Sequence, residues 1–175
     1  MEDEKQININ DLILPLPDDA PKTPFELFGV ECNKGWYPLI LPILEYIQKY
    51  NNSHENSKIY VDQVKEKWAR LEIYVSFDNV PDNVVTETYD MIRKAQEESL
   101  NVCEECGTKE NVGMNMRGWY YVVCEDCLKK QIQKDVDYYG KDYTYKTIRY
   151  WKRNDGKTFK ITPEGITDWD GKTFD

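Results

Sequence analysis

Two cysteine pairs constrain this chain more than any other feature of its sequence. Cys103 and Cys106 form one C-x2-C pair, and Cys124 and Cys127 form a second pair after seventeen intervening residues. Two residues between cysteines allow both sulfurs of a pair to reach one ion about 2.3 Å away in tetrahedral geometry. The spacing therefore predicts one structural zinc ion held by four thiolates, with no open position for a catalytic water.

The residues around the two pairs predict how they are brought together. Gly107 follows the first pair and tolerates the left-handed backbone that a metal-binding turn needs. Residues 111–115 and 118–123 read as the strands of a hairpin. A helix that starts within the second pair has the apolar stripe Leu128, Ile132 and Val136. This order is typical of a treble-clef or ribbon-like zinc finger, here a zinc module over residues 101–140.

Three other uses of these cysteines compete with zinc. A redox pair needs a lowered thiol pKa, whereas acidic neighbours raise it. The acidic neighbours here are Glu104, Glu105, Glu125 and Asp126. Disulfides are rare in the cytoplasm, where we expect this chain to reside. Iron–sulfur ligation uses the same sulfur donors and is left open by the spacing alone.

The composition favours a folded cytoplasmic protein with a polar surface. The chain has 175 residues, of which 40% are hydrophobic, 13% aromatic and 31% charged. No run approaches the roughly 20 apolar residues of a membrane helix, so we expect no membrane partner. Residues 1–10 are acidic and lack the basic start and apolar stretch of a signal peptide.

The periodicities before the zinc module predict an α+β core over residues 31–100. A helix that begins near Trp36 has one apolar face, made of Trp36, Ile40, Ile43, Leu44 and Ile47. Strict alternation over residues 71–75 predicts a strand, with residues 61–68 as its hairpin partner. A second amphipathic helix is expected from Pro81 to about Ser99.

Both ends of the chain differ from the middle. Residues 1–30 are acidic and proline-rich, which favours an extended arm or a loosely ordered tail. Near the other end, Asp-Gly-Lys-Thr-Phe occurs twice, beginning at Asp155 and at Asp170. Asp-Gly between β-prone residues is a strong hairpin-turn signal, so we expect a basic and aromatic C-terminal hairpin within residues 141–175.

The sequence shows no set of catalytic side chains. His54 is the only histidine and lies in a polar stretch over residues 51–57, where we expect it to be solvated. One histidine excludes a Ser-His-Asp set and a pair of histidine metal ligands. Cys32 lies far from the other cysteines in the chain and is expected to be a small buried side chain. No glycine-rich phosphate loop is present.

Charge is distributed unevenly along the chain. The formal net charge is -9, which argues against general affinity for polyanions. Residues 141–160 nevertheless carry seven Lys or Arg and two Asp, a local charge of +5. Aromatic residues alternate with these cations, as on surfaces that stack single-stranded nucleic acid. The candidate contact residues are Arg149, Trp151, Lys152 and Arg153. The alternative is two amphipathic strands with aromatics inward and cations outward.

Several short motifs follow one another along the chain: Gly35-Trp36, then Gln63 to Trp68 with Leu71 and Tyr74, Cys103 to Gly107, Gly118-Trp119 and Cys124 to Cys127. Together they resemble a family of small uncharacterised phage and prophage zinc-binding proteins. The resemblance covers about residues 35 to 130. Ala69-Arg70 stands where the family has Gly-Gly, and Glu72 where it has Arg. The resemblance implies zinc and a phage origin, hence the host cytoplasm, and it implies no activity.

These observations favour a non-enzymatic binding protein. We expect a phage-encoded zinc protein that attaches to a host protein and modulates or inhibits it, with a protein of an antiviral defence system as one candidate. Tyrosine and tryptophan are favoured anchors of protein interfaces, and the chain has thirteen Tyr and five Trp. The alternative is a nucleic-acid-associated accessory protein that uses residues 141–160. An enzyme with an unrecognised site is the third class, and the sequence leaves the oligomeric state open.

Overall fold

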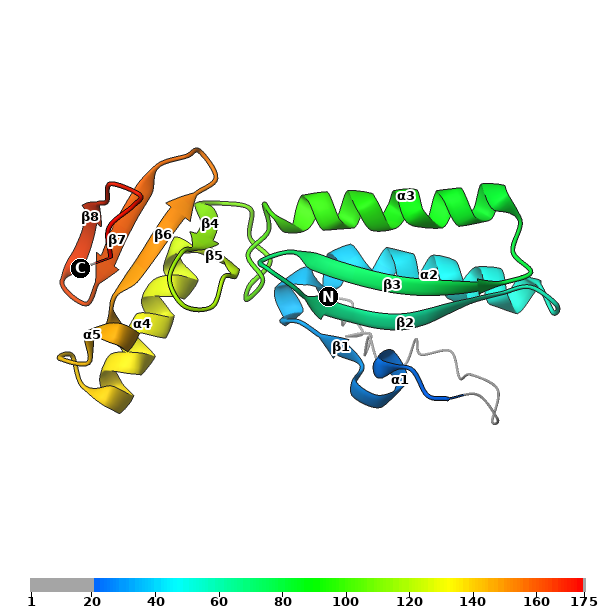
Figure 1. Ribbon diagram of the computed structural model, residues 1–175, viewed down its shortest axis with the longest axis horizontal. Helices are drawn as coiled ribbons and strands as arrows, with labels where there is room; N and C mark the ends of the chain where they lie inside the picture. The colour runs from blue at the N-terminus through cyan, green and yellow to red at the C-terminus, as the bar shows by residue number, and fades with distance from the viewer. Residues whose placement is uncertain (1–20, 175) are drawn as a thin grey trace, which may run out of the picture. The chain divides into compact units, whose positions relative to one another are not determined.

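A computed structural model describes residues 21–174 of the chain (Figure 1). These residues contain both helices and sheets, which confirms the α+β prediction. They divide into two compact units. The first unit comprises residues 21–32, 37–67 and 71–96, and the second comprises residues 33–36, 68–70 and 97–174. No helix within residues 21–174 combines the length and apolarity needed to cross a bilayer.

The first unit is a three-stranded sheet with helices packed on it. Its elements are α1 (Pro24–Phe28), β1 (Val30–Glu31), α2 (Tyr37–Ser53), β2 (Lys58–Glu66), β3 (Leu71–Asp78) and most of α3 (Asp82–Ser99). β2 and β3 form the expected antiparallel hairpin, with Glu66 opposite Leu71, and β1 pairs in parallel with β2. A register shift between Val61 and Gln63 marks a bulge in β2. Because of this bulge, the buried positions of β2 are Ile59, Val61 and Val64 rather than a strict alternation.

The two predicted helices of this region are confirmed. α2 starts at Tyr37 and continues through Pro42 to Ser53. The predicted apolar face is buried throughout: Trp36, Ile40, Ile43, Leu44 and Ile47 are each at most 2% exposed. In α3, Ile92 and Ala95 are buried as expected, whereas Tyr89 is 48% exposed and packs its ring edge on Phe77.

The prediction of an extended arm over residues 1–30 is wrong for residues 24–28, which form a helix. Thr23 caps α1 by accepting the backbone N–H of Glu26, and the Glu26 carboxylate accepts the N–H of Thr23. This capping box and Pro24 in the first turn stabilise a five-residue helix. The proline content of the segment had predicted an extended conformation instead. Val30 then pairs with β2. The remainder of the expected arm, residues 1–20, lies outside the described residues.

The polar stretch over residues 51–57 also begins later than expected, because α2 extends to Ser53. Asn51 is 6% exposed, and its side-chain amide exchanges two hydrogen bonds with the backbone of Ile59, at 2.7 and 2.9 Å. His54 is exposed, stacks on Tyr50 at 4.2 Å between ring centroids, and lies 2.9 Å from the Tyr50 carbonyl oxygen. The histidine therefore has a local partner, contrary to a purely solvated role.

Replacing His54 with alanine is expected to change the free energy of unfolding by less than about 0.5 kcal/mol. The side chain is exposed and contacts only its own helix end among the described residues, and surface substitutions of that kind are usually small. Urea unfolding of both proteins measures the difference. A loss well above 1 kcal/mol would show that the stack on Tyr50 contributes more than its exposure indicates.

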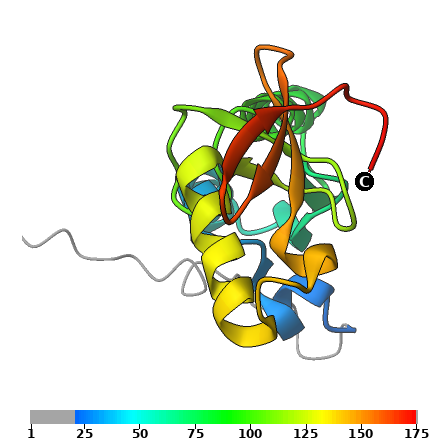
Figure 2. The same cartoon turned by 90° about the vertical axis from the view of Figure 1, so that its left-hand side faces the viewer.

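The second unit is built on a five-stranded sheet of order β5-β4-β6-β7-β8. Its elements are η2 (Lys34–Trp36), β4 (Val112–Asn115), β5 (Val122–Cys124), α4 (Glu125–Tyr139), α5 (Thr144–Thr147), β6 (Arg149–Arg153), β7 (Thr158–Thr162) and β8 (Gly165–Asp168). α4 lies alongside this sheet (Figure 2). Leu128 and Ile132 are buried, as the predicted stripe requires, and Val136 is half-buried.

The C-terminal residues do not form a separate hairpin. β6 and β7 pair around the predicted Asp155-Gly156 turn, but β6 also pairs with β4, and β8 adds a further strand. The second Asp-Gly copy follows β8 and joins no strands among the described residues. Its Asp170 side chain accepts the N–H groups of Lys172 and Thr173, and the turn brings Trp169 and Phe174 onto the ring of Tyr150.

Candidate metal centre

The four predicted cysteines lie together in the second unit. Their sulfur atoms are all within 4.8 Å of one another, and those of Cys106 and Cys124 are 3.7 Å apart. Four sulfurs about 2.3 Å from one ion at tetrahedral angles would lie roughly 3.8 Å from each other. All four cysteines are free of disulfides. The donor set and its spacing therefore fit a metal ion held by four sulfurs.

Cys103 and Cys106 lie on a tight turn after α3. The Gly107 N–H donates to the Cys103 carbonyl at 2.8 Å, and the Cys103 N–H donates to the Thr108 carbonyl at 2.8 Å. Gly107 has φ +79°, the left-handed conformation predicted for this position. These bonds fix the turn from both sides, and they orient two sulfurs toward the second pair.

The second pair lies where β5 passes into α4. Cys124 is the N-cap of α4, and its sulfur accepts the N–H of Cys127 at 3.5 Å. Antiparallel pairing places Cys124 opposite Val112 in β4. Cys127 lies in the first turn of the helix, where the aligned peptide dipoles favour negative charge. The pairing of β5 with β4 and the first turn of α4 therefore position Cys124 and Cys127 without the help of an ion.

Gly35 packs directly on the first cysteine turn, a contact that sequence reasoning did not predict. Its N–H donates to the Glu104 carbonyl at 2.8 Å. A Cβ on Gly35 would lie 2.3 Å from the Cys103 carbonyl oxygen and 2.6 Å from the Gly107 nitrogen. Only glycine permits this approach. The next residue, Trp36, is fully buried and donates its indole N–H to the Val102 carbonyl at 2.8 Å.

Two glutamates of the turn are tied into the same contact. The Glu104 side chain is 5% exposed and accepts the Asn33 N–H at 3.0 Å. The Glu105 carboxylate accepts the side-chain amide of Asn33 at 3.2 Å and that of Gln131 at 3.3 Å. These acidic residues therefore hold residues 33–36 and α4 against the turn. The Gly35-Trp36 pair was visible in the sequence, but nothing local indicated that it packs here.

The thiols respond differently to their surroundings. Burial raises the pKa of Cys124 to about 11, and it also raises the pKa of Cys127. At Cys106, burial opposes ionisation, but hydrogen bonds from the Thr108 backbone and the neighbouring thiols outweigh it and lower the pKa. A protein environment that raises two of these thiol pKa values does not stabilise four thiolates by itself. A bound cation supplies the charge that deprotonates coordinating thiols.

The four candidate contact residues of β6 do not form one surface. Trp151 is 1% exposed and donates its indole N–H to the Val123 carbonyl at 3.1 Å. It is therefore a core residue, which corrects the prediction that it contacts a partner. Lys152 is exposed, as expected for an outward position of the strand.

The two arginines of this set are each paired with a carboxylate. Arg149 contacts Asp135 at 2.5 Å with only 13% of its side chain exposed. Arg153 contacts Asp155 at 2.6 Å, and this hydrogen bond holds the pKa of Asp155 down at about 2. The predicted cationic face is thus largely neutralised at these positions. The strand alternative is right that Tyr150 and Trp151 are buried, but the two adjacent residues lie on opposite faces of β6 rather than on one inward face.

Comparisons with protein-family models, with curated proteins and with solved structures found no match for this chain.

Proposed function

We propose that this chain is a non-enzymatic zinc protein in which the ion stabilises the fold and takes no part in catalysis. The four clustered sulfurs are the observation that supports zinc, because zinc prefers tetrahedral thiolate sites and a four-sulfur site leaves no position for water or substrate. A cysteine turn, a hairpin (β4–β5) and a helix that carries the second pair follow one another in the chain. This order supports a treble-clef type of zinc finger.

The proposed activity is attachment to a partner protein through exposed aromatic side chains of the second unit. The tyrosine surface consists of Tyr138, Tyr139 and Tyr143, which are 81%, 48% and 48% exposed. Tyr139 lies 4.7 Å from Tyr138 and 5.3 Å from Tyr143 between ring centroids. A contiguous exposed aromatic group of this kind marks an interaction site more often than scattered apolar residues do.

The tyrosine surface suits a protein partner for two physical reasons. Tyrosine buries a large apolar ring at little conformational cost and keeps a hydroxyl for hydrogen bonding. It is also enriched among the residues that dominate binding energy. The resemblance to phage proteins leads us to expect a host protein as the partner, with a protein of an antiviral defence system as one candidate. The chain would modulate or inhibit this partner in the host cytoplasm.

Substitution of Tyr138 and Tyr143 together by serine is expected to abolish partner capture. The immobilised full chain is incubated with host lysate, with and without nuclease, and the retained proteins are identified and quantified. Wild-type protein should retain one host protein in stoichiometric amount after nuclease treatment. The double variant should lose it by at least tenfold, since two interface anchors typically cost more than 1.4 kcal/mol.

Tyr74→Ser is the matched control, because Tyr74 is 38% exposed and belongs to the first unit. It should retain the partner, and all three proteins should bind equal amounts of metal. Equal capture by the double variant and the wild type would place the interface elsewhere. Capture that disappears with nuclease would favour the nucleic-acid alternative instead.

A further inference from the structure

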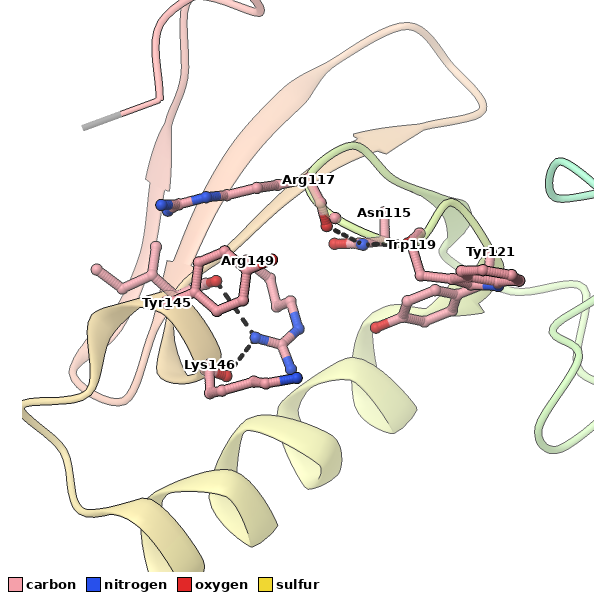
Figure 3. Close-up of a pocket in the computed structure, with 9 residues that line it drawn as sticks. Asn115, Arg117, Trp119, Tyr121, Tyr145, Lys146 and Arg149 are labelled. Carbon is pink, nitrogen blue, oxygen red and sulfur yellow. Dashed lines mark hydrogen bonds between the residues drawn. The ribbon is translucent and has the colours of Figure 1, made fainter.

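A basic pocket of about 200 Å³ lies in the second unit, between the β4–β5 connection and the residues that lead from α5 into β6. Arg117 and Trp119 line it from the first segment, and Tyr145, Lys146 and Arg149 line it from the second. Figure 3 shows these side chains arranged around the pocket. Its lining residues include three cations and no Asp or Glu, in a chain whose net charge is -9.

Two of the three cations have no carboxylate partner within residues 21–174. Arg149 is paired with Asp135, but no described acidic group lies within ion-pair distance of Arg117 or Lys146. The Arg117 guanidinium lies 5.5 Å from the ring centroid of Tyr145, and the Lys146 ammonium lies 5.8 Å from it. The ring therefore holds both charges near the pocket without neutralising them. Such a pocket favours an anionic ligand.

The pocket also contains a hydrogen-bond acceptor that lacks a donor. Asn115 is 1% exposed, and its side-chain N–H groups donate to the Arg117 and Trp119 carbonyls, both at 2.7 Å. These two bonds fix the orientation of the amide, because the opposite orientation would place oxygen against oxygen. The Oδ1 atom has no partner among the described residues and lies on the side that faces Tyr145 and Arg149 (Figure 3). A buried acceptor of this kind calls for a donor.

We propose that this pocket binds a nucleotide. The positive charges of Arg117 and Lys146, on either side of the Tyr145 ring, would attract the phosphate, and a ring N–H or amino group of the base would donate to Asn115 Oδ1. Trp119 is 74% exposed at the pocket and provides an aromatic surface for the base. A phosphate monoester group is largely a dianion at neutral pH and has no donor to offer Asn115, and an uncharged ring leaves both cations without a counter-charge. A nucleotide satisfies both requirements.

The size of the pocket limits the ligand to a single nucleotide. Sites for drug-sized molecules are typically about 300–1,000 Å³, and this pocket is smaller. The nucleotide could be free in solution or could belong to a single strand, because the chemistry at the pocket is the same. This inference does not depend on the tyrosine surface, and either proposal can fail without the other.

Isothermal titration of the full, metal-loaded chain at low ionic strength tests the proposal. The probes are the four nucleoside 5′-monophosphates, the corresponding nucleosides, and ribose 5-phosphate, which keeps the phosphate and lacks the base. At least one monophosphate should bind at least tenfold more tightly than both its nucleoside and ribose 5-phosphate. Arg117→Gln and Lys146→Gln should each weaken that binding about tenfold, whereas the exposed turn residue Lys157, replaced by Gln, should leave it unchanged.

A short single-stranded oligonucleotide of the preferred base distinguishes a free nucleotide from single-stranded nucleic acid as the natural ligand. Tighter binding of the strand, with the same sensitivity to Arg117→Gln, supports the proposal and identifies single-stranded nucleic acid as the source. Equal or weaker binding of the strand supports a free nucleotide. Three results would overturn the proposal: no monophosphate binds, ribose 5-phosphate binds equally well, or Lys157→Gln weakens binding as much as Arg117→Gln. Circular dichroism and metal content confirm that each variant is folded.

Discussion

Replacing Cys124 with serine is expected to release the metal and unfold the second unit. Cys124 supplies one of four clustered sulfurs and also caps α4 through its contact with the Cys127 N–H. Structural zinc sites contribute on the order of 10–16 kcal/mol of binding free energy, whereas whole domains are stable by about 5–15 kcal/mol. Loss of the site is therefore large enough to abolish folding of the unit that depends on it.

Metal content by mass spectrometry and thermal unfolding by circular dichroism measure this effect. The wild type should carry close to one zinc ion per chain, and Cys124→Ser should carry almost none and lose its cooperative transition for the second unit. Cys32→Ser is the matched control, because Cys32 is a half-buried cysteine outside the cluster. It should keep its zinc. A Cys124→Ser protein with unchanged metal content and melting temperature would mean that this sulfur is not a ligand.

Gly35→Ala is expected to destabilise the second unit by about 3 kcal/mol, at the upper end of the range for overpacking. The added methyl group would lie 2.3 to 2.6 Å from three backbone atoms of the first cysteine turn. Backbone atoms cannot rotate away as a side chain can, so the turn or residues 33–36 must shift. Because that turn carries Cys103 and Cys106, the shift should also weaken metal binding.

Urea unfolding and competition with a zinc chelator measure the two consequences of Gly35→Ala. Its neighbour Lys34 is exposed, and Lys34→Ala should change neither stability nor zinc affinity by a measurable amount. If Gly35→Ala matched the wild type in both measurements, the close approach of Gly35 to the cysteine turn would not exist in solution.

Local patterns predicted the local elements well. The C-x2-C spacing located the metal-binding cysteines because two residues between ligands leave few ways to hold one ion. The helical periodicity from Trp36 to Ile47 and the alternation from Leu71 to Val75 each reflected one buried face, and both elements are present. The capping box of Thr23 and Glu26 is also local, but the prediction for residues 1–30 rested on their acidic, proline-rich composition and did not use this motif.

The features that could not be predicted from local sequence patterns depend on residues that lie far apart in the chain. Gly35 contacts the turn at Cys103 across a long separation, and no periodicity encodes such a contact. Similarly, the pairing of β6 with β4 converts an expected hairpin into part of a larger sheet. Tyr150 and Trp151 lie on opposite faces of β6 and are both buried. Trp169 and Phe174 cover the ring of Tyr150, whereas Trp151 packs toward Val123, so both faces of the strand are covered where a one-sided strand would bury only one of the two residues.

The pocket could not be predicted either, because its lining residues lie far apart in the chain. Arg117 and Asn115 lie in the zinc module, whereas Tyr145 and Lys146 lie in the C-terminal region that we expected to be separate. Their combination arises only from the shared sheet. The sequence-based prediction placed the functional cations on β6, and two of those residues are paired with carboxylates. Charge counted along the chain therefore indicated the region that contributes Lys146 and Arg149 to the pocket, but it did not indicate Arg117.

X-ray absorption at the zinc edge, on the purified full chain, tests the central claim most directly. That claim is a closed site of four cysteine sulfurs that stabilises a binding protein and performs no chemistry. The account predicts one zinc ion per chain with four sulfur neighbours at about 2.3 Å and no lighter ligand. A nitrogen or oxygen neighbour in the first coordination sphere, or iron in place of zinc, would contradict it.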